Sequence, residues 1–202
     1  EPKTIPDRFP KGAVIGTTLH EIFENFEFTA IENCDNNLSY VISDRFKANN
    51  INDNPVFLEY VNDIVNNVLN AKLPIIKGNE IDTSNYFKLK EIDSSDRKAE
   101  AEFNFGVEEF DLSNYCNGFI DLLFRRGDYY CILDWKSDTI NDNDLLSYNK
   151  LEDIKRRVDG HYSIQRVLYS YTLINWLYSC NMGSSKQEVF NNHFGGIYYV
   201  FI

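Results

Sequence analysis

The sequence lacks several features that would assign it to particular classes of protein. Its four cysteines form no CxxC pair, so nothing predicts a zinc ribbon, an iron–sulfur cluster or a disulfide framework. No apolar run approaches the roughly 20 residues that a membrane-spanning helix needs, and the N-terminus shows no secretory signal. We therefore expect a protein of a reducing intracellular compartment with no membrane partner.

Positive charge is also scarce. Lysine and arginine number 20 against 31 aspartates and glutamates, which gives a net charge of −11. Such a surface repels polyanions and anionic membranes, which argues against a protein that simply coats nucleic acid. The balance does not argue against an enzyme, because a few cations beside one groove can guide a phosphate backbone while carboxylates hold a metal ion.

The length and composition are those of an ordinary globular domain. The chain has 202 residues, of which 43% are hydrophobic and 15% aromatic, so it can build a core and is not mainly disordered. Residues 1–12 hold three of the five prolines and no periodic pattern. We expect an extended linker over 1–12, trailing from a missing upstream region, and one domain over 13–202. The first residue is Glu1 rather than methionine, which suggests a piece of a longer protein.

Hydrophobic periodicity predicts a mixture of helices and strands. Leu19, Ile22, Phe23 and Phe26 form a helical stripe, with Thr17 or Thr18 as its cap. A second helix is expected over 54–71, with Pro55 in its first turn. Paired strands are expected on either side of the polar turn 93–97, and a last strand over 196–202. A helix over 161–180 would face the core with Ile164, Val167, Leu168, Tyr171 and Tyr178.

The segment 116–138 carries the strongest pattern. Two apolar runs flank Arg126-Gly127-Asp128, which predicts a β-hairpin, and both faces of the first run are apolar, which is typical of a central strand. Because side chains alternate along a strand, Asp134 and Lys136 share one face, and Asp121 on the facing strand would lie near Asp134. Two carboxylates and an ammonium in an apolar sheet need pairing or a metal ion. Oxygen ligands of this kind suit Mg²⁺.

The residues of this predicted site, and the segments around them, resemble a known family. An aspartate followed by an Asp-x-Lys segment across a hairpin resembles the PD-(D/E)xK nuclease pattern, here Asp121 with Asp134-Trp135-Lys136. The surrounding segments are more specific: GTTLHEIFENFEF at 16–28, GFIDLLFRRGDYYCILDWKSD at 118–138, HYSIQRVLYSYTL at 161–173 and HFGGIYYVF at 193–201. In this order they resemble the C-terminal nuclease domain of RecB-type helicase–nucleases over nearly the whole chain. The fold implied is an α/β PD-(D/E)xK core, a mixed central sheet of four or five strands flanked by helices.

The resemblance also implies roles for individual residues. The metal ligands would be His20, Asp121, Asp134 and the backbone carbonyl of Trp135. Lys136 would be the catalytic lysine, together with Asp121 and Asp134. Gln165 and Tyr169 match the family's QxxxY motif, and their spacing places both on one helix face, where they could support the site or contact DNA.

A basic cluster leaves two interpretations open. Lys155, Arg156, Arg157, His161 and Arg166 could form a solvated helix face or a cationic track for phosphates. Arg166 is therefore a candidate DNA-binding or site-supporting residue beside Gln165 and Tyr169.

The function implied is that of a metal-dependent DNA nuclease of the exodeoxyribonuclease V type, acting in double-strand-break repair and recombination. The cofactor would be Mg²⁺, with Ca²⁺ or Mn²⁺ able to substitute in binding, and no iron–sulfur cluster. Implied partners are DNA, preferably single-stranded, RecC- and RecD-like subunits through the full-length parent, and a RecA-type recombinase. The location would be the bacterial cytoplasm. No GxxxxGK[ST] phosphate loop occurs, so ATP-driven movement would belong to the parent.

Two other functions remain open at this stage. The nuclease fold could serve as a docking module that recruits a recombinase or another repair partner. A stand-alone restriction-type endonuclease on the same fold is disfavoured by the proline-rich entry segment. The complete set of His20, Asp121, Asp134 and Lys136 favours an active enzyme over a degenerate scaffold.

Overall fold

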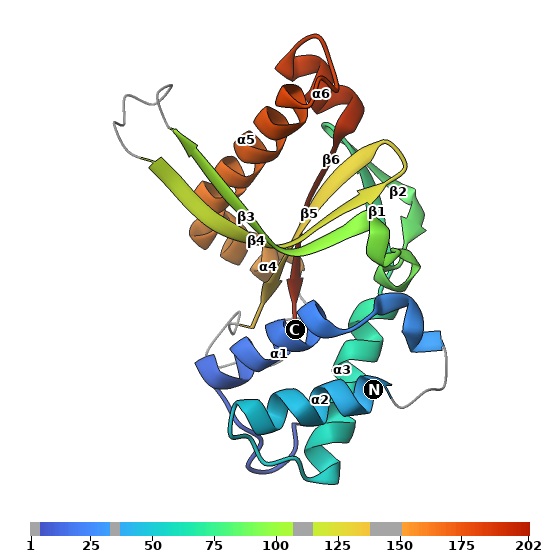
Figure 1. Ribbon diagram of the computed structural model, residues 1–202, viewed down its shortest axis with the longest axis vertical. Helices are drawn as coiled ribbons and strands as arrows, with labels where there is room; N and C mark the ends of the chain where they lie inside the picture. Colours follow the sequence, from blue (N-terminus) through green and yellow to red (C-terminus); the bar gives the residue numbers. More distant parts are fainter. Residues whose placement is uncertain (1–4, 33–36, 107–114, 138–150) are drawn as a thin grey trace. The chain divides into compact units, whose positions relative to one another are not determined.

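The computed structural model describes residues 5–32, 37–106, 115–137 and 151–202 (Figure 1). By internal packing the chain divides into two compact units. The first comprises residues up to 75 together with 82–97 and 202, and the second comprises 76–81 and 98–201. Among the described residues, none of the helices combines the length and the apolar character that crossing a bilayer requires.

The described residues of the first unit form three α-helices, α1 (Ala13–Asn25), α2 (Asn37–Ala48) and α3 (Pro55–Asn70). Helix α3 begins as predicted, because the Asn54 side chain accepts from the Phe57 backbone N–H and Pro55 stands in the first turn. The predicted stripe of α1 is confirmed, since Leu19, Ile22, Phe23 and Phe26 are all buried. Helix α2, which was not predicted, buries Leu38, Ile42 and Phe46.

The predicted cap of α1 is wrong. The helix begins at Ala13, after Gly12 with a φ of 86°, a value that favours glycine. Thr18 lies inside the helix, where its hydroxyl donates to the carbonyl oxygen of Val14 at 2.8 Å. A mid-helix threonine can satisfy its hydroxyl in this way instead of capping.

The largely buried side chain of Arg97 packs against the end of α1 and the residues that follow it in the first unit. Arg97 donates from Nη2 to the Phe26 carbonyl oxygen at 2.8 Å and pairs with Glu27 Oε2 at 3.4 Å. Its guanidinium lies 3.9 Å from the centre of the Phe28 ring, which belongs to a 3₁₀ helix, η1 (Phe28–Glu32). The cation therefore has a carboxylate, a carbonyl and an aromatic ring around it.

The predicted strand pairing around 93–97 is wrong. Strand β2 (Glu80–Phe87) pairs with β1 (Leu73–Lys77) in a separate two-stranded sheet. The residues after it form two 3₁₀ helices, η2 (Leu89–Glu91) and η3 (Ser94–Asp96). The Asp93 side chain accepts from the Ser95 backbone N–H, a local bond that competes with strand structure.

The second unit contains a four-stranded sheet in the order β3-β4-β5-β6. Its strands are β3 (Arg97–Gly106), β4 (Tyr115–Arg126), β5 (Tyr129–Lys136) and β6 (Phe194–Phe201). Strands β4 and β5 form the predicted antiparallel hairpin, and β5 pairs with β6 in parallel. The sheet is therefore mixed, as the α/β prediction requires, and β4 and β5 are its central strands.

The described residues between β5 and β6 form three helices, α4 (Leu151–His161), α5 (Ser163–Ser179) and α6 (Lys186–His193). Such a crossover is what a parallel pair of strands needs. Helix α5 packs against the sheet through Tyr169, Leu173 and Leu177, in one core with Ile120 and Ile132 (Figure 1).

The predicted buried stripe of α5 is wrong. Ile164 and Val167 are 76% and 57% exposed, and Tyr178 is exposed as well. Apolar residues occur around most of this helix, so periodicity alone does not identify the face that packs. Gly160 lies within α4 and does not end it.

Candidate active site

The hairpin of β4 and β5 brings the predicted acidic residues together. In its register Leu122 lies opposite Leu133, and Asp121 and Asp134 are the next residues along each strand. The carboxylate of Asp121 accepts a hydrogen bond at Oδ2 from the backbone N–H of Trp135 at 2.8 Å. Asp121 thus contacts the Asp134-Trp135-Lys136 segment directly, as the strand alternation predicted.

Asp134 and Lys136 form a buried ion pair. Asp134 is only 2% exposed, and its Oδ2 atom pairs with the Lys136 ammonium. This Oδ2 atom is buried, and the Lys136 ammonium is its partner among the described residues. The Lys136 side chain is 12% exposed. Because a charge in such a place is costly without partners, this pair requires support from its surroundings.

Gln165, in the first turn of α5, bridges the two charges. Its Oε1 accepts from Lys136 Nζ at 3.1 Å, and its Nε2 donates to Asp134 Oδ1 at 2.8 Å. The same Nε2 lies 3.0 Å from the Tyr169 hydroxyl, four residues further along the helix. The predicted sharing of one helix face by Gln165 and Tyr169 is confirmed, and that face contacts the ion pair.

Tyr169 completes the support of Asp134. Its hydroxyl lies 3.2 Å from Asp134 Oδ1 and 3.0 Å from the Phe119 carbonyl oxygen, within hydrogen-bond distance of both. Burial and the two nearby aspartates raise the pKa of the Tyr169 hydroxyl. The phenol therefore stays protonated and serves as a donor.

The two carboxylates repel each other. Burial, followed by the charge of Asp134, raises the pKa of Asp121 to about 6, although the Trp135 N–H and Lys136 act in the opposite direction. One ammonium therefore does not offset two carboxylates in this site. A divalent cation would do so, and its binding would favour the ionised form of both aspartates.

The donor set fits a hard cation such as Mg²⁺. Two carboxylates are available, and the buried Oδ2 of Asp134 has the Lys136 ammonium as its partner among the described residues. Mg²⁺ is commonly bound through one or two carboxylates, with waters and substrate phosphates completing its shell. Within the described part of the chain, no three histidine, cysteine or acidic side chains lie together in a group that could hold a metal ion.

The other two predicted metal ligands are His20 and the backbone carbonyl of Trp135. His20 lies on α1 in the first unit and is half-buried, so its role as a ligand stays a prediction. Trp135 is buried, and its side chain lies on the other face of β5 from Asp134 and Lys136. The part of its backbone carbonyl in metal binding also stays a prediction.

The basic cluster resembles a solvated face more than a bare cationic track. Arg166 pairs with Asp159 at 3.2 Å, and Arg156 pairs with Asp153 at 3.2 Å, with exposed guanidinium groups in both pairs. Arg166 is not among the residues that contact the Asp134–Lys136 pair in this structure. Its part in binding DNA stays a prediction.

Sequence reasoning missed two tyrosines at the site. Tyr162, at the junction of α4 and α5, has its ring centre 4.0 Å from Lys136 Nζ, and the ring centre of Tyr199 on β6 is 5.5 Å away. The two rings stack on each other at 5.5 Å. Burial, followed by the charge of Asp134, raises the pKa of Tyr199. Both residues stand inside the segments that carry the family resemblance, but no charge pattern marks them.

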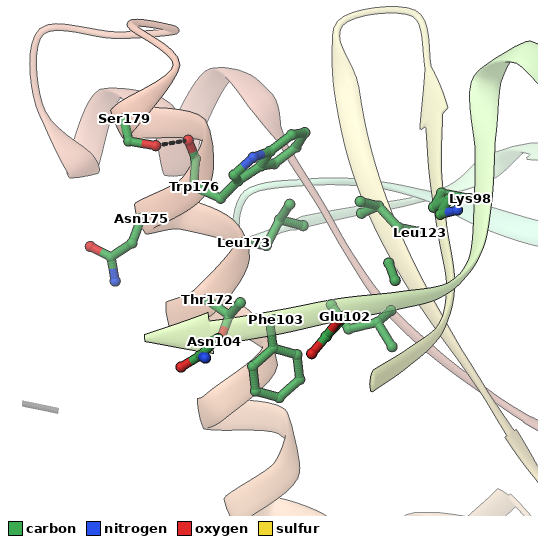
Figure 2. A pocket seen from close by; sticks show the side chains of 12 residues that line it. Lys98, Glu102, Phe103, Asn104, Leu123, Thr172, Leu173, Asn175, Trp176 and Ser179 are labelled. Carbon is green, nitrogen blue, oxygen red and sulfur yellow. Dashed lines mark hydrogen bonds between the residues drawn. The ribbon is translucent and has the colours of Figure 1, made fainter. Parts of the chain in front are cut away.

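A separate cavity of about 590 Å³ lies between strands β3 and β4 and helix α5 (Figure 2). Figure 2 shows Phe103 and Glu102 from β3 and Leu173 and Trp176 from α5 around it. The lining is mostly apolar, and it includes none of the predicted site residues.

No family model matches this chain. It is 27% identical over 230 aligned residues to the RecBCD enzyme subunit RecB of Escherichia coli, which covers 100% of this chain and 18% of that subunit. The RecB subunits of Buchnera aphidicola (subsp. Baizongia pistaciae) and Haemophilus influenzae are 28% and 24% identical, with 98% and 96% of this chain covered.

The chain spans about a sixth of the length of these curated relatives. The matches cover all four segments that predicted the resemblance, because they extend over essentially the whole chain. Its similarity to the C-terminal region of RecB, first indicated by the sequence motifs, is thereby confirmed.

Proposed function

We propose that this chain hydrolyses DNA phosphodiester bonds with the help of Mg²⁺, as the nuclease part of a RecB-type helicase–nuclease in double-strand-break repair and recombination. The observation that carries the proposal is the cluster of Asp121, Asp134 and Lys136, joined by Gln165, at the junction of β4, β5 and α5. It occurs in a chain similar to RecB throughout its length.

The two aspartates are the proposed metal-binding side chains. Asp121 and Asp134 would hold Mg²⁺, with His20 and the Trp135 carbonyl as further ligands carried over from the family. Bound there, the cation would polarise the scissile phosphate and offset its negative charge. Gln165 and Tyr169 keep the Asp134 carboxylate in a fixed orientation through their hydrogen bonds to Oδ1. Such fixed orientation of a ligand is what a metal site needs.

Lys136 is the proposed catalytic lysine. Its ammonium donates to Gln165 and pairs with Asp134, and an ammonium has three N–H donors. Among the residues that the structure describes, two of these donors have acceptors. The third can donate to the attacking water or to a phosphate oxygen, and so orient the water and offset charge as it develops on the phosphorus.

The proposed substrate is DNA, preferably single-stranded, delivered by the motor of the full-length parent. With a net charge of −11, the isolated chain has little electrostatic attraction for duplex DNA. We expect weak cleavage of single strands and poor duplex binding. RecC- and RecD-like subunits, a RecA-type recombinase and a bacterial cytoplasmic location are further parts of this proposal.

The direct test is degradation of end-labelled single-stranded DNA by the purified chain, with Mg²⁺ or with EDTA. Wild type should cleave only with the metal, and Asp134→Asn should lose cleavage. Asp128→Asn, at the exposed turn of the same hairpin, is the matched control and should cleave as wild type does. Metal-independent cleavage, or cleavage retained in Asp134→Asn, would refute the proposed site.

The docking role is the alternative outcome of this test. If the chain binds a RecA-type recombinase but cleaves no DNA under any condition, recruitment becomes its better-supported function. If Lys136→Met abolishes cleavage and leaves that binding intact, the two functions coexist and are separable.

A further inference from the structure

Lys136 is the side chain whose placement matters most for the proposed reaction, and it is intrinsically flexible. A lysine carries its charge on a four-carbon stem with several rotatable bonds. Its ion pair with Asp134 and its bond to Gln165 restrain the ammonium through its charge and one hydrogen bond.

Two aromatic rings lie on the ammonium as well. Nζ lies over the face of Tyr162 at 4.0 Å from the ring centre and over that of Tyr199 at 5.5 Å. Both distances are within the range in which a ring face attracts a cation, about 6 Å, and the attraction is stronger where water is excluded. With its side chain 12% exposed, Lys136 meets that condition.

The fold fixes both rings by separate means. Tyr199 is the direct partner of Asp134 in the parallel pairing of β5 and β6, so its side chain projects on the same face as Asp134 and Lys136. Tyr162 immediately precedes α5, three residues before Gln165. The rings stack at an angle of 22°, and the Tyr199 hydroxyl lies 3.4 Å from the Tyr162 carbonyl oxygen. Each tyrosine therefore restrains the other.

An aromatic ring differs from a further carboxylate in how it holds the ammonium. A neutral ring attracts the ammonium without adding negative charge, whereas a third carboxylate would repel a phosphodiester and compete for the metal ion. A ring face also leaves the N–H donors of the ammonium for stronger acceptors. This arrangement holds the charge in place and keeps its hydrogen bonds available to the substrate.

We infer that Tyr162 and Tyr199 are positioning residues, an aromatic pair that holds the Lys136 ammonium in the orientation needed for phosphodiester cleavage. The catalytic consequence rests on the proposed function, whereas the positioning itself does not. The aromatic ring is the required feature, so phenylalanine should replace either tyrosine and leucine should not.

A spectroscopic signature tests the positioning without DNA. In the 202-residue chain labelled with ¹³C at lysine Cε, protons held over a ring face resonate upfield of those of exposed lysines such as Lys98. The Lys136 signal is assigned by its absence in Lys136→Met. It should be upfield in wild type, Tyr162→Phe and Tyr199→Phe, and should move toward the exposed-lysine position in Tyr162→Leu and Tyr199→Leu.

Kinetics on single-stranded DNA test the consequence. We expect each leucine variant to lower kcat by about 3- to 30-fold, the range that a lost cation–π contact allows, with KM within about twofold. The phenylalanine variants should stay near wild type. Tyr178→Leu, at an exposed position of α5 away from Lys136, is the matched control and should change neither the spectrum nor kcat.

The outcomes distinguish the positioning of the Lys136 ammonium from its consequence for DNA cleavage. A Lys136 signal at the exposed-lysine position in wild type overturns the inference whatever the DNA assay shows. The expected signal with no cleavage by wild type refutes the proposed function and leaves the positioning standing. The expected signal with unchanged kcat in both leucine variants shows that the pair is structural only, which also overturns the inference.

Discussion

The two units of this chain each bury a cation, and they do so in different ways. In the first unit Arg97 is 9% exposed and has one carboxylate, Glu27, together with a carbonyl oxygen and the Phe28 ring. In the second unit Lys136 also has an aromatic environment, but it shares the site with two aspartates, Asp121 and Asp134. Of the charged groups that these contacts name, the first cluster has one cation for one carboxylate, whereas the second has one cation for two carboxylates.

We interpret this difference as that between a structural cluster and one suited to bind a cation. A balanced buried pair gains nothing from an added ion. Removing one member of the pair leaves the other charge without a partner. An excess carboxylate is unfavourable in the free protein, as the raised pKa of Asp121 indicates. Strong perturbation of this kind, caused by burial and a named neighbour, is typical of functional sites. The comparison predicts that Arg97 variants lose stability and Lys136 variants lose activity.

The largest expected effect is on catalysis. Lys136→Met should lower kcat on single-stranded DNA by about 100-fold or more, because it removes a donor that acts on developing charge. Lys98→Met, an exposed lysine on β3 of the same sheet, should have no effect on kcat. Comparable kcat for Lys136→Met and wild type would contradict the proposed catalytic role of Lys136.

The next effect is on stability and concerns the balanced cluster. Arg97→Met should lower the free energy of unfolding by about 2–4 kcal/mol, because Glu27 and the Phe26 carbonyl lose their buried partner. Urea denaturation measures this loss. Arg45→Met, which breaks a more exposed pair with Asp44, is the control and should cost less than about 1 kcal/mol. Equal losses in the two variants would contradict the importance of burial at Arg97.

A smaller effect concerns the excess carboxylate and depends on pH. Because the pKa of Asp121 is about 6 in the folded chain and 3.8 in the reference state, the folded form holds a proton that the unfolded form loses between these values. Stability from this group therefore falls as pH rises through that window and stays lower above it. In EDTA, Asp121→Asn should stabilise the chain by about 1 kcal/mol near pH 8, after allowance for partial exposure.

Near pH 4 the same substitution should have little effect, since Asp121 is then largely protonated when folded. Urea denaturation at the two pH values measures the difference. Asp159→Asn, in an exposed ion pair, is the matched control. A stabilisation by Asp121→Asn that is equal at both pH values would show that the excess charge is not its cause.

The smallest effect sharpens the contrast between buried and exposed groups within the second unit. Burial raises the pKa of the Cys131 thiol to about 12, while Cys180 is exposed. In a chain with Cys34 and Cys116 changed to serine, one thiol should react quickly with a disulfide reagent and the other only after unfolding. Loss of the fast reaction in Cys180→Ser identifies it. Fast reaction of Cys131 in the folded chain would contradict its placement.

Much of the site was predictable because it depends on local rules. The hairpin of β4 and β5 follows from two apolar runs and a glycine turn, and strand alternation then brings Asp121 to the Asp134–Lys136 segment. The spacing of Gln165 and Tyr169 gives their shared helix face. What local rules do not give is which tertiary neighbours surround Lys136. Tyr199 comes from a strand 63 positions away from Lys136 in the numbering, and only the parallel register of β5 and β6 places it there.

The errors in the fold have similar causes. Strand β2 is polar and largely exposed, so it has no alternating pattern to mark it. The apolar Leu89 and Ile92, just before the turn at 93–97, favour a strand where the structure has η2. Helix α2 has only three buried apolar positions, and half of its twelve residues are polar. In α5 the opposite holds, because apolar residues on several sides hide the face that packs. Tertiary packing, not local pattern, decides these cases.

The central claim is that Asp121 and Asp134 form a site for a divalent cation, and direct titration tests it most simply. Calorimetric titration of the purified chain with Mg²⁺, and with Mn²⁺ as a second probe, should show binding in wild type and in Arg97→Met as long as that variant is folded. Binding should be lost in Asp134→Asn and weakened in Asp121→Asn. Wild-type affinity in Asp134→Asn, or no binding by the wild-type chain with either cation, would contradict the account.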